Sequence, residues 1–321
     1  MCVYDRTQPL LDGRIKTDGI DLTMLSPTIE ECIIGMLHHR QWDAAEMSFS
    51  ASLIAVERGE PAFTLLPIFP SRCFRHSAIF VNTAAGIERP EDLRGKRVGV
   101  PAYARLAAAV WVRGMLEDDY GISPSDVTWV VPEPLPIGSS DNIPIQLPPE
   151  MKIEEVGTDP WIDQRLAAGE IDALVTARLP RPFIDGDPRV GRLFADPKEV
   201  EADYFRRTGI FPPMHVIAVR RELYEAHPWI GPSLFEAFVQ AKRVGLSDAY
   251  EIDVSRHSLG WWVTYLEEER AVLGNDPWTY GVIPNRHTIK TFIDYCHRQG
   301  LLERRLAIND VFPANLLDTA G

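Results

Sequence analysis

The sequence predicts an α/β protein with two domains. Short apolar segments alternate along the chain with longer amphipathic segments, an order of elements that is typical of α/β folds. The chain has 321 residues, and at about 150 residues per domain this length favours two domains. Hydrophobic residues make up 45% of the chain and charged residues 25%. These are ordinary globular values, which exclude disordered, collagen-like and coiled-coil classes.

The first predicted elements are a helix, a strand and a second helix. In the segment 28–42, apolar residues recur at positions i, i+3, i+4, i+7 and i+8, which predicts a helix with one buried face. Ser26 and Pro27 are suited to its cap and first turn. The segment 43–60 predicts a short strand that ends at Glu46 or Met47, followed by a helix that begins in small residues. A strand-to-helix turn of this kind lies at the ligand-binding edge of an α/β sheet.

Strands and helices continue to alternate through the rest of the chain. Apolar runs predict strands at 63–71, 76–83, 97–100, 171–180 and 214–223. Helical patterns are found at 89–95, 105–118, 161–168, 233–246, 254–273 and 288–299. The proline-rich segment 132–149 can form neither a helix nor a central strand, so it is predicted to be an excursion loop.

The charge balance bears on the class of partner. The chain carries 33 Lys and Arg against 46 Asp and Glu, a net charge of −13. This balance argues against nucleic acid and against an anionic membrane surface, so an anionic ligand needs a local positive cluster. Of the cations 27 are Arg, whose planar fork holds a carboxylate through two hydrogen bonds. Codon bias is the alternative explanation for this excess.

The four cysteines, Cys2, Cys32, Cys73 and Cys296, are too widely spaced for a zinc site or a disulfide framework. They favour a reducing compartment. The N-terminal segment lacks the pattern of a signal peptide, and no apolar run approaches the ~18 residues of a membrane helix. We therefore expect a cytoplasmic protein without membrane partners.

Several segments resemble one enzyme family. They are YDRT at 4–7, AEMS at 45–48, FPSRCFRHSAIFVN at 69–82, RPEDLRGKRVGVP at 89–101, RRTGIFPPMHVIAV at 206–219 and DPWTYGVIPNRHT at 276–288. Together they resemble 4,5-dihydroxyphthalate decarboxylase and its relatives, in the same order and over nearly the whole chain.

The resemblance implies a two-lobed, type 2 periplasmic-binding-protein-like fold with a ligand cleft between lobes that are joined by two hinge crossings. Lobe I would comprise residues 1–76 and the mostly helical 216–321, and lobe II residues 77–215. The segments around His76 and His215 would then lie at the two crossings.

The resemblance also implies a carboxy-lyase reaction, the non-oxidative conversion of 4,5-dihydroxyphthalate to 3,4-dihydroxybenzoate and CO2. Each ring carboxylate has a hydroxyl para to it, so a base on the phenol and an acid above the ring suffice, without cofactor or metal. His76 and His215 are the candidate acid and base, and Glu46 is a third candidate because burial can raise a carboxyl pKa. For each histidine, a structural hydrogen-bonding role is the alternative.

Further polar residues are candidates for binding the substrate carboxylates and hydroxyls. They are Arg6, Ser48, Arg72, Arg75, Tyr103 and Arg178. Because residues three apart in an extended segment face opposite sides, only one of Arg72 and Arg75 is expected to face the ligand. For Arg72 and for Arg75, a surface salt bridge is the alternative.

Two other functions remain open at this point. One is a non-catalytic solute-binding protein that delivers an aromatic carboxylate to a transporter. The other, an enzyme of thiamine pyrimidine synthesis, is less favoured because its cysteine-rich signature is absent. The expected partner is a small aromatic dicarboxylate, and assembly into a homo-oligomer is left open.

Overall fold

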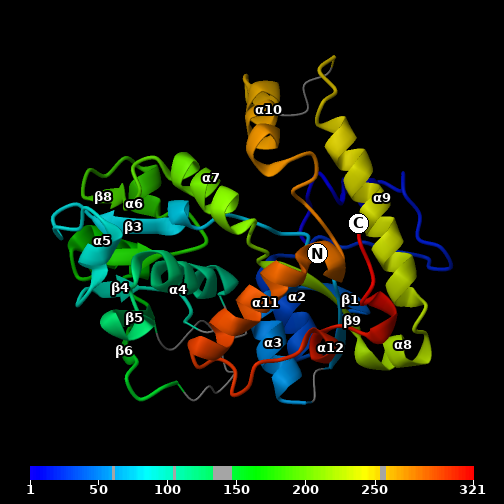
Figure 1. Cartoon of the computed structure of the whole chain (residues 1–321), viewed down its shortest axis with the longest axis horizontal. Helices are drawn as coiled ribbons and strands as arrows, with labels where there is room; N and C mark the ends of the chain where they lie inside the picture. The colour runs from blue at the N-terminus through cyan, green and yellow to red at the C-terminus, as the bar shows by residue number, and fades with distance from the viewer. Residues whose placement is uncertain (60–61, 104–105, 133–146, 254–257) are drawn as a thin grey trace. The chain divides into compact units, whose positions relative to one another are not determined.

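The chain divides into two compact units (Figure 1). The structure is a computed structural model that describes residues 1–59, 62–103, 106–132, 147–253 and 258–321. Unit 1 consists of Met1–Arg72, Phe205–Lys290 and Leu306–Gly321, and unit 2 of Cys73–Tyr204 and Thr291–Arg305.

Unit 1 contains a three-stranded sheet with β9 at its centre. β1 (Ala44–Ser48) and β2 (Phe63–Leu66) each pair with β9 (His215–Arg220) in antiparallel orientation. Figure 1 shows β1 and β9 side by side. Residues 216–219 of β9 are all apolar and buried, as is typical of a strand in the interior of a domain.

Helices account for most of the rest of unit 1. They are α1 (Gln8–Leu11), α2 (Ile29–Leu37), α3 (Phe49–Glu57), α8 (Arg221–Ala226), α9 (Ile230–Asp248), α10 (Trp262–Leu273), α12 (Ile308–Val311) and the 3₁₀ turn η4 (Ala314–Leu316). The core that β2, β9 and α9 form includes the buried residues Leu66, Ile217, Val219, Phe235 and Phe238. This apolar core fixes the position of β9 and therefore of the residues at its N-terminal end.

Unit 2 contains a six-stranded mixed sheet in the order β6-β5-β4-β7-β3-β8. The strands are β3 (Ile79–Asn82), β4 (Arg97–Gly99), β5 (Thr128–Pro132), β6 (Lys152–Val156), β7 (Ala173–Val175) and β8 (Val190–Arg192). β4 pairs in parallel with β5 and β7, and β5 with β6, whereas β3 is antiparallel to both β7 and β8.

The helical elements of unit 2 are η1 (His76–Ala78), η2 (Pro90–Leu93), α4 (Ala107–Tyr120), η3 (Pro124–Asp126), α5 (Ile162–Ala168) and α6 (Arg181–Ile184). α5 packs against β3, β4 and β7. Phe80, Val130, Ile162, Leu166 and Leu174 form the core between them.

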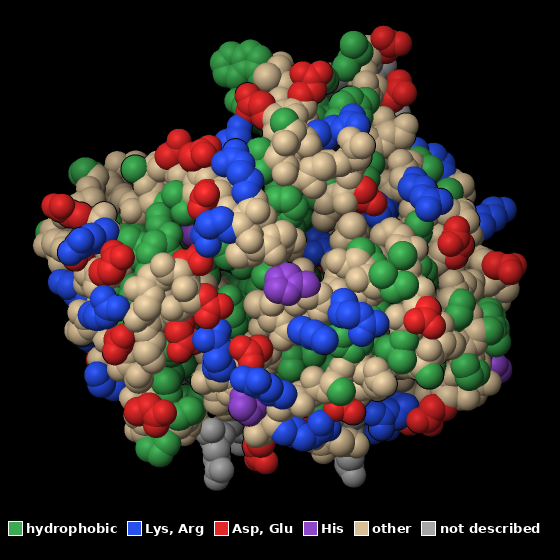
Figure 2. Space-filling model, in the orientation of Figure 1, with side chains coloured by type: hydrophobic (Ala, Val, Ile, Leu, Met, Phe, Trp, Pro, Cys, Tyr) green, Lys and Arg blue, Asp and Glu red, His purple; other side chains and the backbone are tan. Residues whose placement is uncertain are grey.

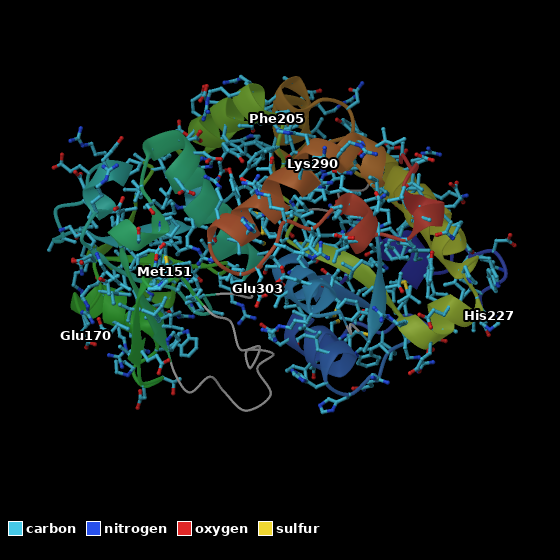
Figure 3. All side chains as sticks on the ribbon, turned by 60° about the horizontal axis from the view of Figure 1, so that its bottom comes forward. Met151, Glu170, Phe205, His227, Lys290 and Glu303 are labelled. Carbon is cyan, nitrogen blue, oxygen red and sulfur yellow. The ribbon has the colours of Figure 1, made fainter. Side chains whose placement is uncertain are left out.

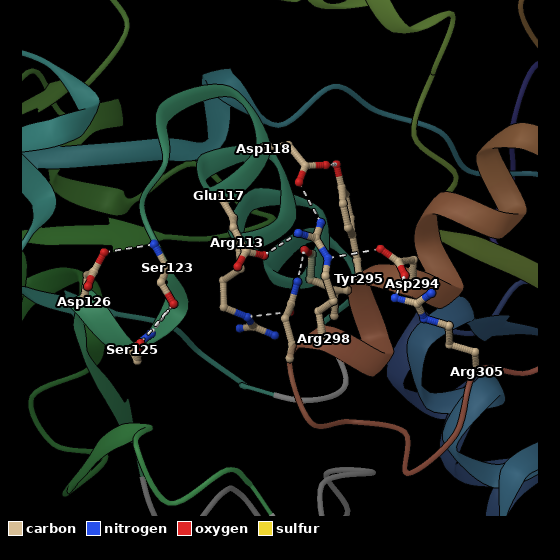
Figure 4. Close-up of polar contacts among 12 residues, drawn as sticks. Arg113, Glu117, Asp118, Ser123, Ser125, Asp126, Asp294, Tyr295, Arg298 and Arg305 are labelled. Atoms are coloured by element: carbon tan, nitrogen blue, oxygen red, sulfur yellow. Dashed lines mark hydrogen bonds and ion pairs between the residues drawn. The ribbon is translucent and has the colours of Figure 1, made fainter.

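The C-terminal half of α11 (Val282–Arg298) is fastened to α4 within unit 2 (Figure 4). The Tyr295 hydroxyl donates a hydrogen bond of 2.7 Å to Asp118, and Arg298 pairs with Glu117 at 2.8 Å and with Asp118 at 2.7 Å. Gly114 of α4 lies so close to the Tyr295 ring that a Cβ there would stand 2.2 Å from a ring carbon. The absence of a side chain at residue 114 thus permits this packing.

Two of the unit boundaries in the C-terminal half of the chain fall within helices. Figure 3 labels Phe205 on α7 (Pro197–Thr208) and Lys290 on α11, the residues at which these helices change unit. The lobe boundaries expected at residues 76 and 215 stay predictions.

The start of α10 and the end of α9 expose an apolar surface. In Figure 2, hydrophobic and acidic side chains gather over this upper end of the molecule. The exposed large hydrophobic residues of this stretch are Tyr250, Ile252, Leu259, Trp261 and Tyr265. No residue of α10 is buried, and none of the helices in the described part of the chain is long and apolar enough to cross a membrane.

Most predicted elements exist, with shifted ends. The predicted helix at 28–42 is α2, but Thr28 and not Ser26 or Pro27 caps it, because Thr28 and Glu31 form reciprocal side-chain to backbone hydrogen bonds. The helix predicted from residue 288 begins already at Val282. Pro284 does not oppose this, since proline is tolerated in a first helical turn.

Some elements were not predicted. β6, α6 and β8 are short, and α7 is largely polar, with only Ala202 and Tyr204 buried. Most of the excursion loop predicted at 132–149 lies outside the described residues, as do the predicted helix starts at Arg105 and Val254.

Candidate active site

The centre of the candidate site is a histidine and a glutamate on neighbouring strands of unit 1. In the register of β1 with β9, Glu46 is opposite Ile217 and Ser48 is opposite His215. Side chains alternate along a strand, so Glu46 and Ser48 point to one face, and His215 reaches Glu46 diagonally across the pair. The two side chains meet with 2.6 Å between His215 Nδ1 and Glu46 Oε1.

Glu46 is fully buried and is surrounded by hydrogen-bond donors. Besides His215, the Tyr4 hydroxyl donates to Oε1 at 2.5 Å and the Cys2 backbone N–H donates to Oε2 at 2.9 Å. Burial alone would raise the pKa of the Glu46 carboxyl, but the hydrogen bonds and the charge of His215 outweigh it, so the pKa is lowered. Glu46 is therefore an ionised carboxylate at neutral pH.

His215 has one nitrogen held by the protein and one available for chemistry. Nδ1 faces the Glu46 carboxylate, which fixes it as the nitrogen that carries a proton in the neutral ring. Nε2 has no hydrogen-bond partner among the described residues, and 22% of the side chain is exposed. A carboxylate at this distance also stabilises positive charge that develops on the ring. The pair can thus accept and deliver a proton at Nε2.

Tyr4, in the YDRT motif, is a further candidate residue that was not among those predicted. Its backbone carbonyl accepts the N–H groups of Thr7 at 3.0 Å and Gln8 at 2.9 Å, which closes the turn before α1. Burial and then the charge of Glu46 raise the pKa of the Tyr4 phenol. The phenol therefore stays protonated and remains a donor to Glu46. Burial, followed by Glu46, likewise raises the pKa of the Cys2 thiol to about 11.

Two buried arginines contact the segment Trp278–Tyr280 in unit 1. The Arg6 guanidinium carbon lies 3.3 Å from the centroid of a Trp278 ring, and Arg6 donates to Pro70 O at 3.1 Å. Arg72 donates to Phe211 O and Thr279 O, each at 2.7 Å, and to the side chain of Asn285. The terminal nitrogens of Arg72 are thus hydrogen-bonded to acceptors of the protein itself.

Both arginines are almost completely shielded from solvent. Both are 6% exposed, and burial lowers the pKa of Arg72 to about 10. Tyr280 is fully buried beside them, its hydroxyl has no partner among the described residues, and burial raises its pKa to about 12. Sequence reasoning did not select Trp278, Tyr280 or Asn285, although all three lie in the motif at 276–288.

Ser48 lies at the junction of β1 and α3. It is buried as the N-cap residue of α3, and its Oγ is 3.2 Å from Ser50 Oγ. Its carbonyl accepts a hydrogen bond of 2.8 Å from the Ser52 hydroxyl. The predicted strand-to-helix turn therefore exists and carries Glu46 and Ser48 on one face of the sheet.

The remaining predicted residues belong to unit 2. His76 is 1% exposed and packs edge-on against the rings of Phe194 and Tyr204, with ring centroids 5.4 and 5.2 Å away. Arg75 precedes it, and burial lowers the pKa of its guanidinium.

Tyr103 and Arg178, also in unit 2, differ in exposure. Tyr103 is buried under the guanidinium of Arg113, whose Cζ is 3.9 Å from the ring centroid. Arg178 is exposed, three residues after β7.

Unit 1 thus brings together Glu46, Ser48 and His215 on one sheet face, and Arg6 and Arg72 around one segment. In the described part of the chain no group of three or more His, Cys, Asp or Glu residues could hold a metal ion.

Known structures identify the class of fold. The periplasmic aliphatic sulphonate binding protein SsuA from Escherichia coli is similar to this chain with a TM-score of 0.53 at 11% identity, covering 98% of this chain and 94% of SsuA. The chain therefore has a periplasmic-binding-protein-like α/β fold of two lobes.

Sequence comparison identifies the family. The chain is 36% identical over 317 residues to 4,5-dihydroxyphthalate decarboxylase from Comamonas testosteroni, covering 98% of this chain and 95% of that protein. It is 37% identical over 203 residues to 4,5-dihydroxyphthalate decarboxylase from Pseudomonas putida, covering 63% of this chain and 78% of that protein. Residues 15–134 also match a family model described as NMT1/THI5 like. The chain belongs to the 4,5-dihydroxyphthalate decarboxylase family.

Proposed function

We propose that this protein is a carboxy-lyase that converts 4,5-dihydroxyphthalate to 3,4-dihydroxybenzoate and CO2. The two relatives that carry the name of this activity are 36% and 37% identical to it. The observation that carries the proposal is the pair of His215 and Glu46, in which a buried carboxylate fixes Nδ1 and leaves Nε2 to exchange a proton. Such a pair supplies the acid/base chemistry that this reaction needs.

The proposed reaction is a proton-for-carboxylate exchange on the ring. Removal of the proton from the hydroxyl para to one carboxylate pushes an electron pair toward the carbon that bears this carboxylate. That carbon takes up a proton, the bond to the carboxylate breaks, and CO2 leaves while its bonding electrons restore the aromatic ring. The proton removed from the phenol returns to the product phenolate, and the proton on the ring carbon is drawn from solvent through the acid. One proton is therefore consumed for each CO2 released, and nothing is oxidised or reduced.

In this proposal His215 is a group that accepts or delivers a proton at Nε2, and Glu46 stabilises the imidazolium that forms. As Glu46 stays ionised, the negative charge lies next to the ring nitrogen in both protonation states of His215. The nearby Ser48 hydroxyl is proposed to bind a substrate oxygen. Arg72 is proposed to contribute positive potential, since its hydrogen bonds are directed to neutral protein groups. The charge of Arg6, which also donates to Pro70 O, is paired with Asp5 at 2.7 Å, so its proposed role is to support the site.

His76, Arg75, Tyr103 and Arg178 of unit 2 are proposed as further substrate or acid/base groups on the basis of the motif resemblance. The protein is further proposed to act in phthalate breakdown in the cytoplasm. The free thiols of Cys2, Cys32, Cys73 and Cys296 are consistent with a reducing compartment.

The test is incubation of purified, chelator-treated protein with 4,5-dihydroxyphthalate, following CO2 release and the aromatic product by chromatography. Native protein should turn over, and His215→Gln should lower kcat by about two to four orders of magnitude while substrate still binds. His227→Gln, at an exposed position, is the matched control and should retain full activity. Binding without turnover by the native protein, even after metal is restored, would instead favour a solute-binding protein.

A further inference from the structure

Glu46 accepts two hydrogen bonds on one oxygen. The Tyr4 hydroxyl and His215 Nδ1 both approach Oε1, at 2.5 and 2.6 Å, while the Cys2 N–H is bonded to Oε2. A carboxylate oxygen has two lone-pair directions in the carboxylate plane, so these two donors fill them. Tyr4 therefore fixes the direction from which His215 can meet the carboxylate.

Tyr4 is itself held in place from its backbone. Its N–H donates to Thr7 Oγ1 at 3.1 Å, and its carbonyl accepts from Thr7 and Gln8. The Arg6 guanidinium lies 5.4 Å from the phenol ring centroid. With the backbone held by these hydrogen bonds, the position from which the ring starts is set, and the hydroxyl is directed at Glu46.

We propose that Tyr4 is a positioning residue of the reaction, whose hydroxyl orients the Glu46 carboxylate toward Nδ1 of His215 and sets the pH range in which the pair exchanges its proton. The inference rests on the proposed decarboxylase function for its catalytic consequence. It concerns the hydrogen bonds of the pair, which can be measured without substrate.

The direction of the effect follows from charge. A donor on Oε1 disperses the negative charge of Glu46, which weakens the attraction of the carboxylate for the proton on Nδ1. Without the Tyr4 hydroxyl, the carboxylate would stabilise the imidazolium more strongly, and the pair would lose its proton at higher pH. The two groups titrate as a coupled pair, so the observed midpoint belongs to both.

The other titratable and charged groups around Glu46 do not change this direction. The Cys2 and Cys32 thiols and the Met1 amino group interact electrostatically with one another and, for the thiols, with Glu46. Burial raises the pKa of both thiols, to about 11 for Cys2, so they stay neutral across the working range. The Arg6 guanidinium beside the Tyr4 ring is paired with the Asp5 carboxylate at 2.7 Å, and neither group is changed by the replacement of Tyr4.

The experiment compares native protein with two altered proteins. One is Tyr4→Phe, and in the other 3-fluorotyrosine is incorporated site-specifically at position 4 alone. The ring signals of His215 are followed by NMR against pH in the free protein, and kcat and KM are followed against pH with 4,5-dihydroxyphthalate. Tyr265→Phe, at an exposed position of α10, is the matched control.

We expect the pH midpoint of the His215 ring signals to rise by about one pH unit in Tyr4→Phe. It should fall with fluorotyrosine, whose hydroxyl is a stronger hydrogen-bond donor. In Tyr4→Phe, kcat should fall about ten- to a hundredfold while KM changes by less than about twofold. A midpoint that stays at the native value in both proteins, or moves the same way in both, would overturn the inference, because a purely structural tyrosine predicts that result. Opposite shifts together with no decarboxylation in native protein would refute the proposed reaction and retain the role of Tyr4 in orienting the pair.

Discussion

Replacing Arg72 by methionine should destabilise unit 1 substantially. Methionine is unbranched like the arginine stem but has no donor, so the change deletes the hydrogen bonds to Phe211 O, Thr279 O and the Asn285 side chain. Two of these acceptors keep another donor, since the Asn285 amide still reaches Thr279 O and the Thr279 hydroxyl still reaches Asn285.

The magnitude follows from this count. A buried acceptor that loses its donor costs about 1–3 kcal/mol, and hydrogen bonds to a charged group are worth about 1.5–3 kcal/mol each. Part of this loss is offset because the variant no longer has to remove a cation from water. The burial that causes this cost also lowers the pKa of Arg72 to about 10. With two acceptors still bonded, the expected loss in free energy of unfolding is about 2–4 kcal/mol.

Urea unfolding followed by far-ultraviolet circular dichroism measures this loss as a decrease in midpoint of about 1 M. Arg286→Met, at an exposed position of the same α11 helix that carries Asn285, is the control and should change stability by less than about 0.5 kcal/mol. If Arg72→Met is as stable as the control, the hydrogen bonds of Arg72 are not structural, and its role as a clamp for a substrate carboxylate regains support.

Three further changes test other parts of the structure. Because the folded-state pKa of Glu46 is lowered, its ionisation stabilises the fold above about pH 4.5, and this contribution is lost as the pH falls through the folded-state value. Glu46→Gln should therefore cost stability at pH 7 but progressively less below about pH 4.5 in urea unfolding, and a pH-independent difference would contradict the ionised assignment. Gly114→Ala should lower the Tm in a thermal scan, since collision with the Tyr295 ring costs about 1–3 kcal/mol and outweighs the gain of about 1 kcal/mol in helix propensity; a raised Tm would show that the ring moves aside. Thr28→Ala should remove the capping box with Glu31 and cost about 1 kcal/mol, seen as faster amide hydrogen exchange in α2, and unchanged exchange would mean that packing alone holds this helix end.

Local sequence patterns predicted most elements of the fold but not how they pair. The strand-to-helix turn at Ser48 and the apolar strand at 215–220 both follow from residues close in sequence. Their antiparallel pairing does not, because Glu46 and His215 are 169 positions apart and only tertiary packing sets the register. The motif resemblance selected both residues, yet their contact could be learned only from the structure.

The arginines show a different limit of sequence reasoning. Arg6 and Arg72 were selected because an arginine fork suits a carboxylate, and the same fork suits backbone carbonyls equally well. Which of these acceptors an arginine meets depends on chain segments remote in sequence, such as Phe211 and Thr279 for Arg72. Residue type and spacing alone could not decide between them.

The pairing of β1 with β9 also bears on how the protein acquires its chemistry during synthesis. β1 leaves the ribosome long before β9, and until β9 inserts between β1 and β2, the carboxylate of Glu46 has no His215 to meet. Contacts between such distant segments form slowly because a long loop must first close. A nascent chain, or a folding intermediate that lacks the central strand, would therefore lack the proposed catalytic pair, and the appearance of His215 beside Glu46 would report completed folding of unit 1.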